Sequence, residues 1–366
     1  MTTVTFLLSK DPETTHGGDL TLSRLLVALA ETSSSVTRIC LSPTPAHSTA
    51  ELTRVHKPEV SPARIALRSL RGGKSLVHTR FDVDALVPAL ENSSSDVYIA
   101  DHSYMAEPYL RSALAESSAK LLVNTVISES LVWKSTRGVV GRLDTPRIRR
   151  DELRVARAAH SVGTYDAEEV DDYRRAGITN IHWLDLTLPP AEQVAVADSQ
   201  ARLVFLGDRT WPPNDEAFRL LLQWWPDIAW GIDAELLVIG KRGQGKQPEL
   251  PEGATDLGFA DDLDAVLGTA RALVAPILTG GGVRVKMLDC ASRGLPIVGT
   301  RAGVGSLASV FGLGTFDTRE EFIARCRELL LDRAAAVREG DRLYAANRDR
   351  WMAGAPQSTV EKWLAS

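Results

Sequence analysis

The feature that most constrains this chain is an alternation of short apolar runs, rich in β-formers, with segments whose apolar residues recur at helical spacing. Such alternation predicts a parallel sheet wrapped by helices. The first set of apolar runs is VTFLLS, VTRICLS, DVYIAD, KLLVNTV and HSVGTY, between residues 4 and 165. The pattern pauses at Pro189 and Pro190, which is typical of a linker.

The same pattern then begins again. Its runs are RLVFLGD, AELLVIG, TDLGF, RALVAPIL and LPIVGT, between residues 202 and 300. We therefore expect an α/β chain with two doubly wound, Rossmann-like domains. The tail after residue 318 is predicted to be helical, and its last segment could pack away from the second domain.

Composition agrees with two globular domains and narrows the class of protein. The chain has 366 residues, 44% hydrophobic, with a net charge of -5, whereas nucleic-acid-binding domains usually carry a basic excess. Its three cysteines are widely spaced, which predicts neither a disulfide framework nor a zinc site and favours the cytoplasm. No basic leader and no run of about 18 apolar residues is present, so we expect neither secretion nor membrane spanning.

A glycine-rich segment, PILTGGGVRVKMLDCASRGLPIVGT, occupies residues 276–300. Its three glycines, at 280–282, follow a predicted strand and precede a predicted helix. A helix N-terminus and bare backbone N–H groups favour an anion, and Arg284 and Lys286 add positive charge. This pattern indicates a phosphate or diphosphate site. The alternative is that the glycines only form a tight turn and that the two cations are solvated. The chain contains no Walker motif and no GxGxxG after the first strand, so an ordinary nucleotide triphosphatase or dinucleotide enzyme is not indicated.

Several motifs in order resemble the donor-binding half of the retaining GT-B glycosyltransferases of family four. They are FLGDRTWPPN (205–214), LLVIG (236–240), LGFADDL (257–263), the segment at 275–300 and AGVGSL (302–307). The first half resembles the family less closely, through HGGD (16–19), VNTVISES (123–130) and TYDAEEVDDYRRAG (164–177).

The resemblance implies transfer of a sugar from a nucleoside-diphosphate sugar to an acceptor, with retention at the anomeric carbon and no required metal or other cofactor. It implies two Rossmann-like domains facing a central cleft: residues 1–188, completed by residues 350–366, on the acceptor side, and residues 189–349 for the donor. The acceptor would be a small molecule, a lipid-linked compound or a glycan, and no nucleic-acid partner is expected.

Candidate site residues follow from the matched motifs. Arg284 and Lys286 would stabilise the diphosphate as it leaves, and Asp289, at the second acidic position of the family's E-x7-E motif, would bind ribose hydroxyls. Gly281 replaces the first glutamate of that motif, which holds the donor sugar in relatives. The remaining donor-binding candidates are Gly17, Gly18, Arg209, Lys241, Gly258, Phe259, Gly281, Gly282 and Val283.

In the first half, His102 lies at a predicted strand end, where relatives place a histidine against the donor sugar through its ring or its backbone. The alternative is a histidine that only fills a loop. Asn124 and Glu129 match the family's H-N-x-E-S region in part. We expect Trp224, Trp225 and Trp230 to be core residues rather than a sugar platform.

A basic cluster spans residues 134–157, with eight cations and three acids. Intrahelical ion pairs on a solvated face are the favoured interpretation, and an acidic acceptor or peripheral contact with the inner membrane face is the alternative. Two other functions stay open for the chain. One is a catalytically silent sugar-nucleotide-binding protein, as Gly281 suggests, and the other is a nucleotide-sugar epimerase on the same fold.

Overall fold

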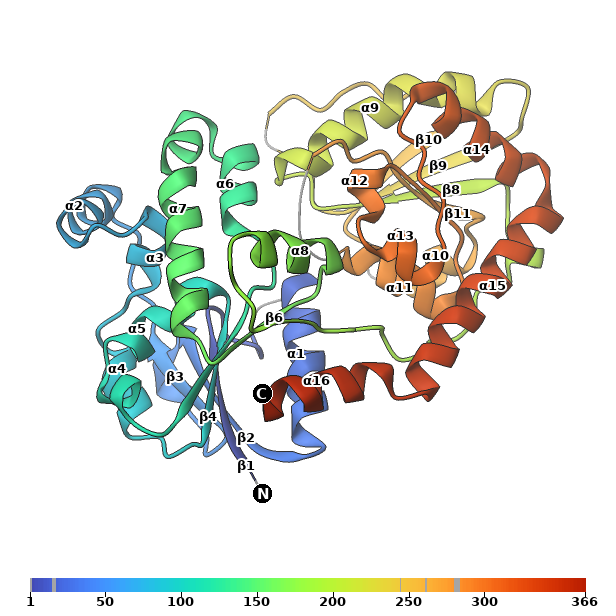
Figure 1. The fold of residues 1–366 in the computed structure, drawn as a ribbon. Helices are drawn as coiled ribbons and strands as arrows, with labels where there is room; N and C mark the ends of the chain where they lie inside the picture. Colours follow the sequence, from blue (N-terminus) through green and yellow to red (C-terminus); the bar gives the residue numbers. More distant parts are fainter. Residues whose placement is uncertain (1, 15–17, 244, 261, 280–283) are drawn as a thin grey trace. The chain divides into compact units, whose positions relative to one another are not determined.

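The computed structural model describes residues 2–14, 18–243, 245–260, 262–279 and 284–366 (Figure 1). The chain forms two compact units. Unit 1 comprises Met1–Leu186 and Ala355–Ser366, and unit 2 comprises Thr187–Gly354. Each is an α/β unit with its own parallel sheet, as the alternating sequence pattern predicts.

Unit 1 contains a seven-stranded sheet in the order β3-β2-β1-β4-β5-β6-β7. Its strands are β1 (Thr2–Leu8), β2 (Ser34–Ser42), β3 (Leu52–His56), β4 (Val97–Asp101), β5 (Lys120–Asn124), β6 (Ser161–Thr164) and β7 (Ile181–Trp183). Its helices are α1 (Gly18–Glu31), α2 (Pro62–Gly72), α3 (Leu76–Phe81), α4 (Leu86–Glu91), α5 (Glu107–Leu110), α6 (Glu129–Thr136), α7 (Gly138–Ala158), α8 (Ala167–Arg175) and α16 (Ala355–Ala365).

Unit 2 contains a five-stranded sheet in the order β10-β9-β8-β11-β12. Its strands are β8 (Arg202–Leu206), β9 (Glu235–Ile239), β10 (Ala254–Gly258), β11 (Ala272–Ala275) and β12 (Ile297–Gly299). Its helices are α9 (Pro212–Ala229), α10 (Leu263–Gly268), α11 (Val285–Arg293), α12 (Arg301–Val304), α13 (Leu307–Phe311), α14 (Arg319–Leu331) and α15 (Arg333–Met352).

Both strand orders reverse direction at one place in the sheet. In unit 1 the reversal falls between β1 and β4, and in unit 2 it falls between β8 and β11. The loops that leave two such strands at their carboxyl ends run to opposite faces of the sheet and leave a crevice where ligands bind. The carboxyl edge at these strand pairs is therefore the part of each unit to search for a site.

The two strands that the apolar pattern missed lie at the edges of the unit 1 sheet. β3 is LTRVH, in which three of the five residues are polar, and β7 has only three residues. An edge strand is partly exposed and short, so its apolar signal is weak. All ten predicted runs contain a strand.

Two of the three tryptophans behave as predicted. Trp224 and Trp225 are buried on α9, and the Trp225 indole N–H donates to the Glu252 carbonyl at 2.8 Å. The prediction for Trp230 is wrong, because its side chain is 78% exposed. Trp230 follows the last residue of α9, where the helical periodicity that would turn it inward no longer applies.

The α16 helix belongs to unit 1, where it packs against α1, β6 and β7. Its Trp363 is fully buried beside Gly163 of β6. A Cβ atom on Gly163 would lie 2.6 Å from Leu184 and 3.0 Å from the Trp363 ring, so only glycine allows this packing.

The carboxyl ends of β8 and β9 approach closely through two glycines. Gly240 has φ +127°, and a Cβ atom there would lie 2.1 Å from the Gly207 carbonyl oxygen. Gly240→Ala should lower the free energy of unfolding by about 1–3 kcal/mol, because the added methyl displaces backbone. Gly231→Ala is the matched control: Gly231 also has positive φ but open space around it, so its cost should stay near 1 kcal/mol. Chemical denaturation measures both, and equal losses would contradict the steric argument.

Candidate active site

Lys286 lies at the strand reversal of unit 2. It is in the first turn of α11, which follows β11, and its Nζ donates to the Leu206 carbonyl at the end of β8 at 2.8 Å. A second hydrogen bond, 3.2 Å long, runs to Oδ1 of Asn214 in the first turn of α9. One ammonium group thus joins the carboxyl edges of β8 and β11 beside two helix N-termini.

The electrostatic surroundings of Lys286 favour an anion. Burial lowers its pKa to about 8, and the charge of Arg284 acts in the same direction. Its hydrogen bonds go to two neutral oxygens, the Leu206 carbonyl and Oδ1 of Asn214. A half-buried cation with only neutral oxygen partners gains strongly from an incoming phosphate.

Arg284 is the N-cap residue of α11, two residues before Lys286. Its Nε and Nη2 donate to the Ala302 carbonyl at 2.9 and 2.7 Å. Ala302 belongs to α12, which follows β12, and Gly305 beyond it packs against the guanidinium. The AGVGSL motif therefore orients Arg284.

Asp289 lies about one turn beyond Lys286 on α11. Its Oδ1 accepts from Nη2 of Arg293 at 2.8 Å, and Arg293 also pairs with Asp264 at 2.8 Å. The carboxylate is half-buried, so one side of it stays accessible to a hydroxyl group. Its ribose-binding role remains a prediction.

Arg209 has a structural partner. Its fully buried guanidinium forms two 2.8 Å hydrogen bonds with the Asp256 carboxylate and lies 4.6 Å from the Phe218 ring centre. Burial opposes ionisation of Asp256, but the bonds from Arg209 outweigh it and lower the pKa of Asp256. This pair joins the β8–α9 loop to β10, so the Arg209 guanidinium has a structural role in unit 2.

The candidates for base binding lie on the loops after β9 and β10. Lys241 is exposed, and its carbonyl accepts from the Arg209 backbone N–H at 2.8 Å. Gly258 has φ +66°, and Phe259 beside it is 84% exposed. The exposed ring of Phe259 could stack on a nucleobase, because aromatic faces pack well against one another.

Four predicted residues, Gly17, Gly281, Gly282 and Val283, lie outside the described residues. Gly18 is the first residue of α1, directly after the β1 loop. It therefore flanks the β1–β4 reversal of unit 1, where the prediction of a donor-facing loop would place it.

His102 flanks the same reversal in unit 1, directly after β4. Its backbone has φ 83°, a region that non-glycine residues rarely adopt, and its side chain is 5% exposed. The ring contacts the Asp101 carbonyl through Nδ1 at 2.8 Å and stacks on Tyr104 with ring centres 4.9 Å apart. Strained backbone of this kind gathers at functional sites.

A second strained residue follows the neighbouring strand β5. Val126 has φ 54°, which is unusual for a β-branched side chain, and its N–H donates to Oδ1 of Asn124 at 3.3 Å. The Asn124 amide also donates to Asp101 at 2.7 Å, and Asp101 accepts from Ser23 of α1 at 2.5 Å. The side chain of Asn124, which the sequence motif matches only in part, thus adds a link between the carboxyl ends of β4 and β5.

Asn214 is a site residue that the sequence analysis did not select. Its amide holds the β8–α9 loop by donating to the Asp208 carbonyl at 2.9 Å, while its oxygen accepts from Lys286. The available signal was its place at the end of the FLGDRTWPPN segment, after two prolines at a predicted helix start.

The basic cluster at 134–157 is largely engaged within unit 1. Arg147, Arg149 and Arg154 form i,i+3 pairs with Asp144, Glu152 and Asp151, as the favoured interpretation predicts. Arg147 and Arg154 also reach beyond α7, to the Lys74 carbonyl at 2.6 Å and to the Glu107 carboxylate. These cations therefore hold surrounding segments against α7.

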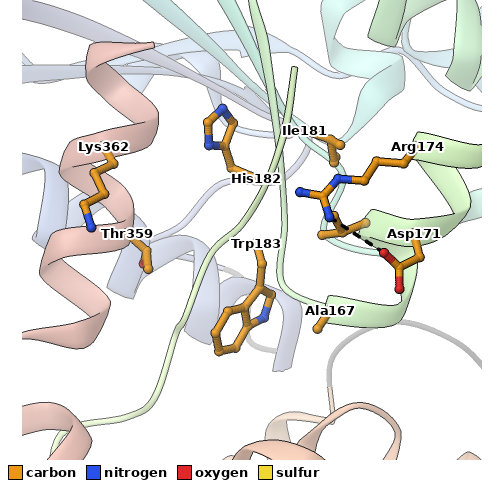
Figure 2. Close-up of a pocket in the computed structure, with 9 residues that line it drawn as sticks. Ala167, Asp171, Arg174, Ile181, His182, Trp183, Thr359 and Lys362 are labelled. Atoms are coloured by element: carbon orange, nitrogen blue, oxygen red, sulfur yellow. Dashed lines mark ion pairs between the residues drawn. The ribbon is translucent and has the colours of Figure 1, made fainter. Parts of the chain in front are cut away.

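A separate surface cavity of about 320 Å³ lies beside the edge strand β7 (Figure 2). Thr359 and Lys362 of α16 line one side, Asp171 and Arg174 of α8 line the other, and His182 and Trp183 of β7 lie between them (Figure 2). None of the predicted site residues lines this cavity.

Comparison with known proteins gives a family model and a fold. Residues 200–332, most of unit 2, match the family model described as "Glycosyl transferases group 1". No curated protein matches the chain.

Among solved structures, sucrose-phosphate synthase from Thermosynechococcus elongatus is similar over 100% of both chains, with 13% identity and a TM-score of 0.72. WaaG, a glycosyltransferase involved in lipopolysaccharide biosynthesis, is similar over 99% of this chain and 100% of its own, with 11% identity and a TM-score of 0.66. HepE from Anabaena, solved with UDP and glucose, covers 100% of both chains, with 13% identity and a TM-score of 0.67. The chain therefore has the GT-B fold, and its residues 200–332 carry the sequence pattern of the group 1 glycosyl transferases.

Proposed function

We propose that this protein is a retaining glycosyltransferase of family four that transfers a sugar from a nucleoside-diphosphate sugar to an acceptor. The observation that carries the proposal is the position of Lys286, a half-buried cation on the carboxyl edge of β8 beside the N-termini of α9 and α11. The UDP-bound HepE structure supports a nucleotide-sugar donor for this fold.

The chemistry that this site would perform is stabilisation of charge. When the glycosidic bond breaks, the diphosphate gains negative charge and the sugar gains oxocarbenium character. Lys286, Arg284 and the N-terminus of α11 would stabilise the leaving diphosphate without a bound metal. Asp289 would hold the ribose, and the exposed Phe259 and Lys241 would contact the base.

The test is a mass-spectrometric screen of donor depletion across UDP-, GDP- and deoxythymidine-linked sugars, with cell extract as the acceptor source. Depletion of one donor, with release of its nucleoside diphosphate and sugar transfer, is the expected result. Tight binding with no turnover would instead indicate a silent binding protein. An altered sugar without transfer would indicate an epimerase.

A further inference from the structure

Unit 1 exposes apolar side chains in two segments that also carry only positive charge. The first segment, residues 62–74, contains α2, and the second, residues 131–143, contains the turn between α6 and α7. Among the described residues, six of the thirteen exposed large hydrophobic side chains lie in these segments: Leu67, Leu70, Leu131, Val139, Val140 and Leu143. Leu70 and Leu143 are 75% and 74% exposed.

The charges of these segments are all of one sign. They contain seven cations and no acidic residue, although the whole chain has a net charge of -5. Lys74 and Arg68 are engaged within unit 1, where they donate to the Asp82 carboxylate at 2.7 Å and to the Asp82 carbonyl at 3.0 Å. Other cations of the segments are exposed among the leucines and valines: Arg64, Arg71, Lys134, Arg137 and Arg142.

Hydrogen bonds tie the first segment to α7, the helix in which the second segment ends. Arg147 of α7 donates to the carbonyls of Ser69 and Lys74 at 3.1 and 2.6 Å, which fixes the C-terminal end of α2. Arg147 is nine residues beyond the start of α7, so α2 is anchored roughly 14 Å along that helix from the α6–α7 turn. Figure 1 shows α2 and the α6–α7 hairpin projecting from unit 1 away from its sheet.

We propose that these two segments form a docking surface for an anionic lipid bilayer. Exposed leucine and valine side chains enter the boundary between headgroups and acyl chains, and exposed arginine and lysine pair with anionic headgroups. The two segments combine exposed aliphatic side chains with cations and contain no acidic residue, which complements an anionic bilayer in both charge and polarity. No helix in the described residues is long and apolar enough to cross a membrane.

α6 connects the docking surface to the carboxyl end of β5 in the unit 1 sheet. α6 begins at Glu129. Burial raises the pKa of the Glu129 carboxyl, and the nearby His102 imidazole acts in the opposite direction. The eight residues of α6 span about 12 Å, so the docking surface is one short helix away from His102 and Asn124. A bilayer bound there would bring headgroups close to that edge. This docking inference does not rest on the transferase activity.

Vesicle co-sedimentation of the full chain tests the proposal. We expect binding to vesicles of phosphatidylcholine and phosphatidylglycerol in equal parts, no binding to phosphatidylcholine alone, and weaker binding at high salt. The double variant Arg71→Gln with Arg142→Gln should bind about 25-fold more weakly, at about fivefold for each cation removed. The double variant Leu70→Ser with Leu143→Ser should also lose binding, because the apolar insertion is removed.

Matched controls make the result specific. Met352→Ser and Arg338→Gln remove side chains that are 74% and 71% exposed on α15 of unit 2, and they should bind vesicles as the unaltered chain does. Unchanged melting temperatures exclude unfolding of the variants. Equal binding to both vesicle types, no vesicle binding, or an oligomer that the Leu70→Ser and Leu143→Ser changes dissociate would each overturn the proposal. The last outcome would assign the surface to a second copy of the chain.

Discussion

The Lys286→Met variant should bind the nucleoside diphosphate about 10–100-fold more weakly than the unaltered chain, with a melting temperature that is not lowered. The loss corresponds to about 1.5–3 kcal/mol, the scale of a hydrogen bond between charged groups. Isothermal titration with the diphosphate that the donor screen identifies measures the affinity, and a thermal scan measures the stability.

The stability result follows from the pKa of Lys286. Its folded pKa of about 8 lies below the ordinary value of 10.5, so folding disfavours the protonated form. The stabilising contribution of the neutral amine is complete only above the ordinary pKa and is lost as pH falls toward about 8. At pH 7 the folded chain therefore holds an unfavourable cation, and methionine removes that cost while losing the bonds to Leu206 and Asn214.

The same pKa predicts how diphosphate binding responds to pH. Affinity should fall as pH rises through about 8, because Lys286 loses its proton. Lys286→Arg keeps the charge and should remove that fall. Arg338→Ala, which removes an exposed cation of α15, is the control and should leave both affinity and its pH dependence unchanged. Unchanged affinity in Lys286→Met would exclude this residue from the site.

The fold was predictable from sequence where burial is strong. Eight of the ten apolar runs contain central strands, which are largely apolar because a parallel sheet is covered on both faces. The other two contain β10 and β12, the edge strands of the unit 2 sheet. β3 (LTRVH) and β7 (IHW) were missed because polar residues interrupt these short strands at the edges of the unit 1 sheet. Trp230 was misplaced because one residue beyond α9 is enough to break the helical face.

The site was predictable only where one local segment carries it. Arg284 and Lys286 could be selected because glycines, a helix start and two cations are neighbours in sequence. The contact of Lys286 with the Leu206 carbonyl could not, because it joins residues 80 positions apart across the reversal of strand order. Arg209 was selected from its place after β8, but only the structure shows the Asp256 carboxylate that engages it.

Glu169 in unit 1 gives the second large effect. Its carboxylate is 9% exposed in the first turn of α8, and Oε2 accepts from Thr125 at 2.8 Å and from Thr164. Oε1 is buried and has no hydrogen-bond partner among the described residues. Burial raises the pKa of Glu169 to about 7. Glu169 therefore joins the ends of β5 and β6, and the stability of that connection depends on whether its carboxyl is protonated.

The sign of the effect follows from that raised pKa. The folded pKa lies above the ordinary 4.5, so the stabilising contribution of protonated Glu169 is complete below pH 4.5 and is lost as pH rises through about 7. Glu169→Gln keeps the acceptor for both threonines and cannot ionise. The variant should exceed the stability of the unaltered chain by less than about 1 kcal/mol at about pH 5 and by about 3 kcal/mol at about pH 8.5.

Denaturant titration at both pH values, with hydrogen exchange followed in β5 and α8, measures this difference where it arises. Glu168→Gln is the matched control, because Glu168 is exposed beside Glu169 and should leave the pH dependence unchanged. If Glu169→Gln loses as much stability as the unaltered chain between the two pH values, Glu169 is ionised at a normal pKa. The two threonine hydroxyls would then donate to a buried carboxylate rather than to a neutral acid, and Thr125 and Thr164 alone would have to stabilise that charge.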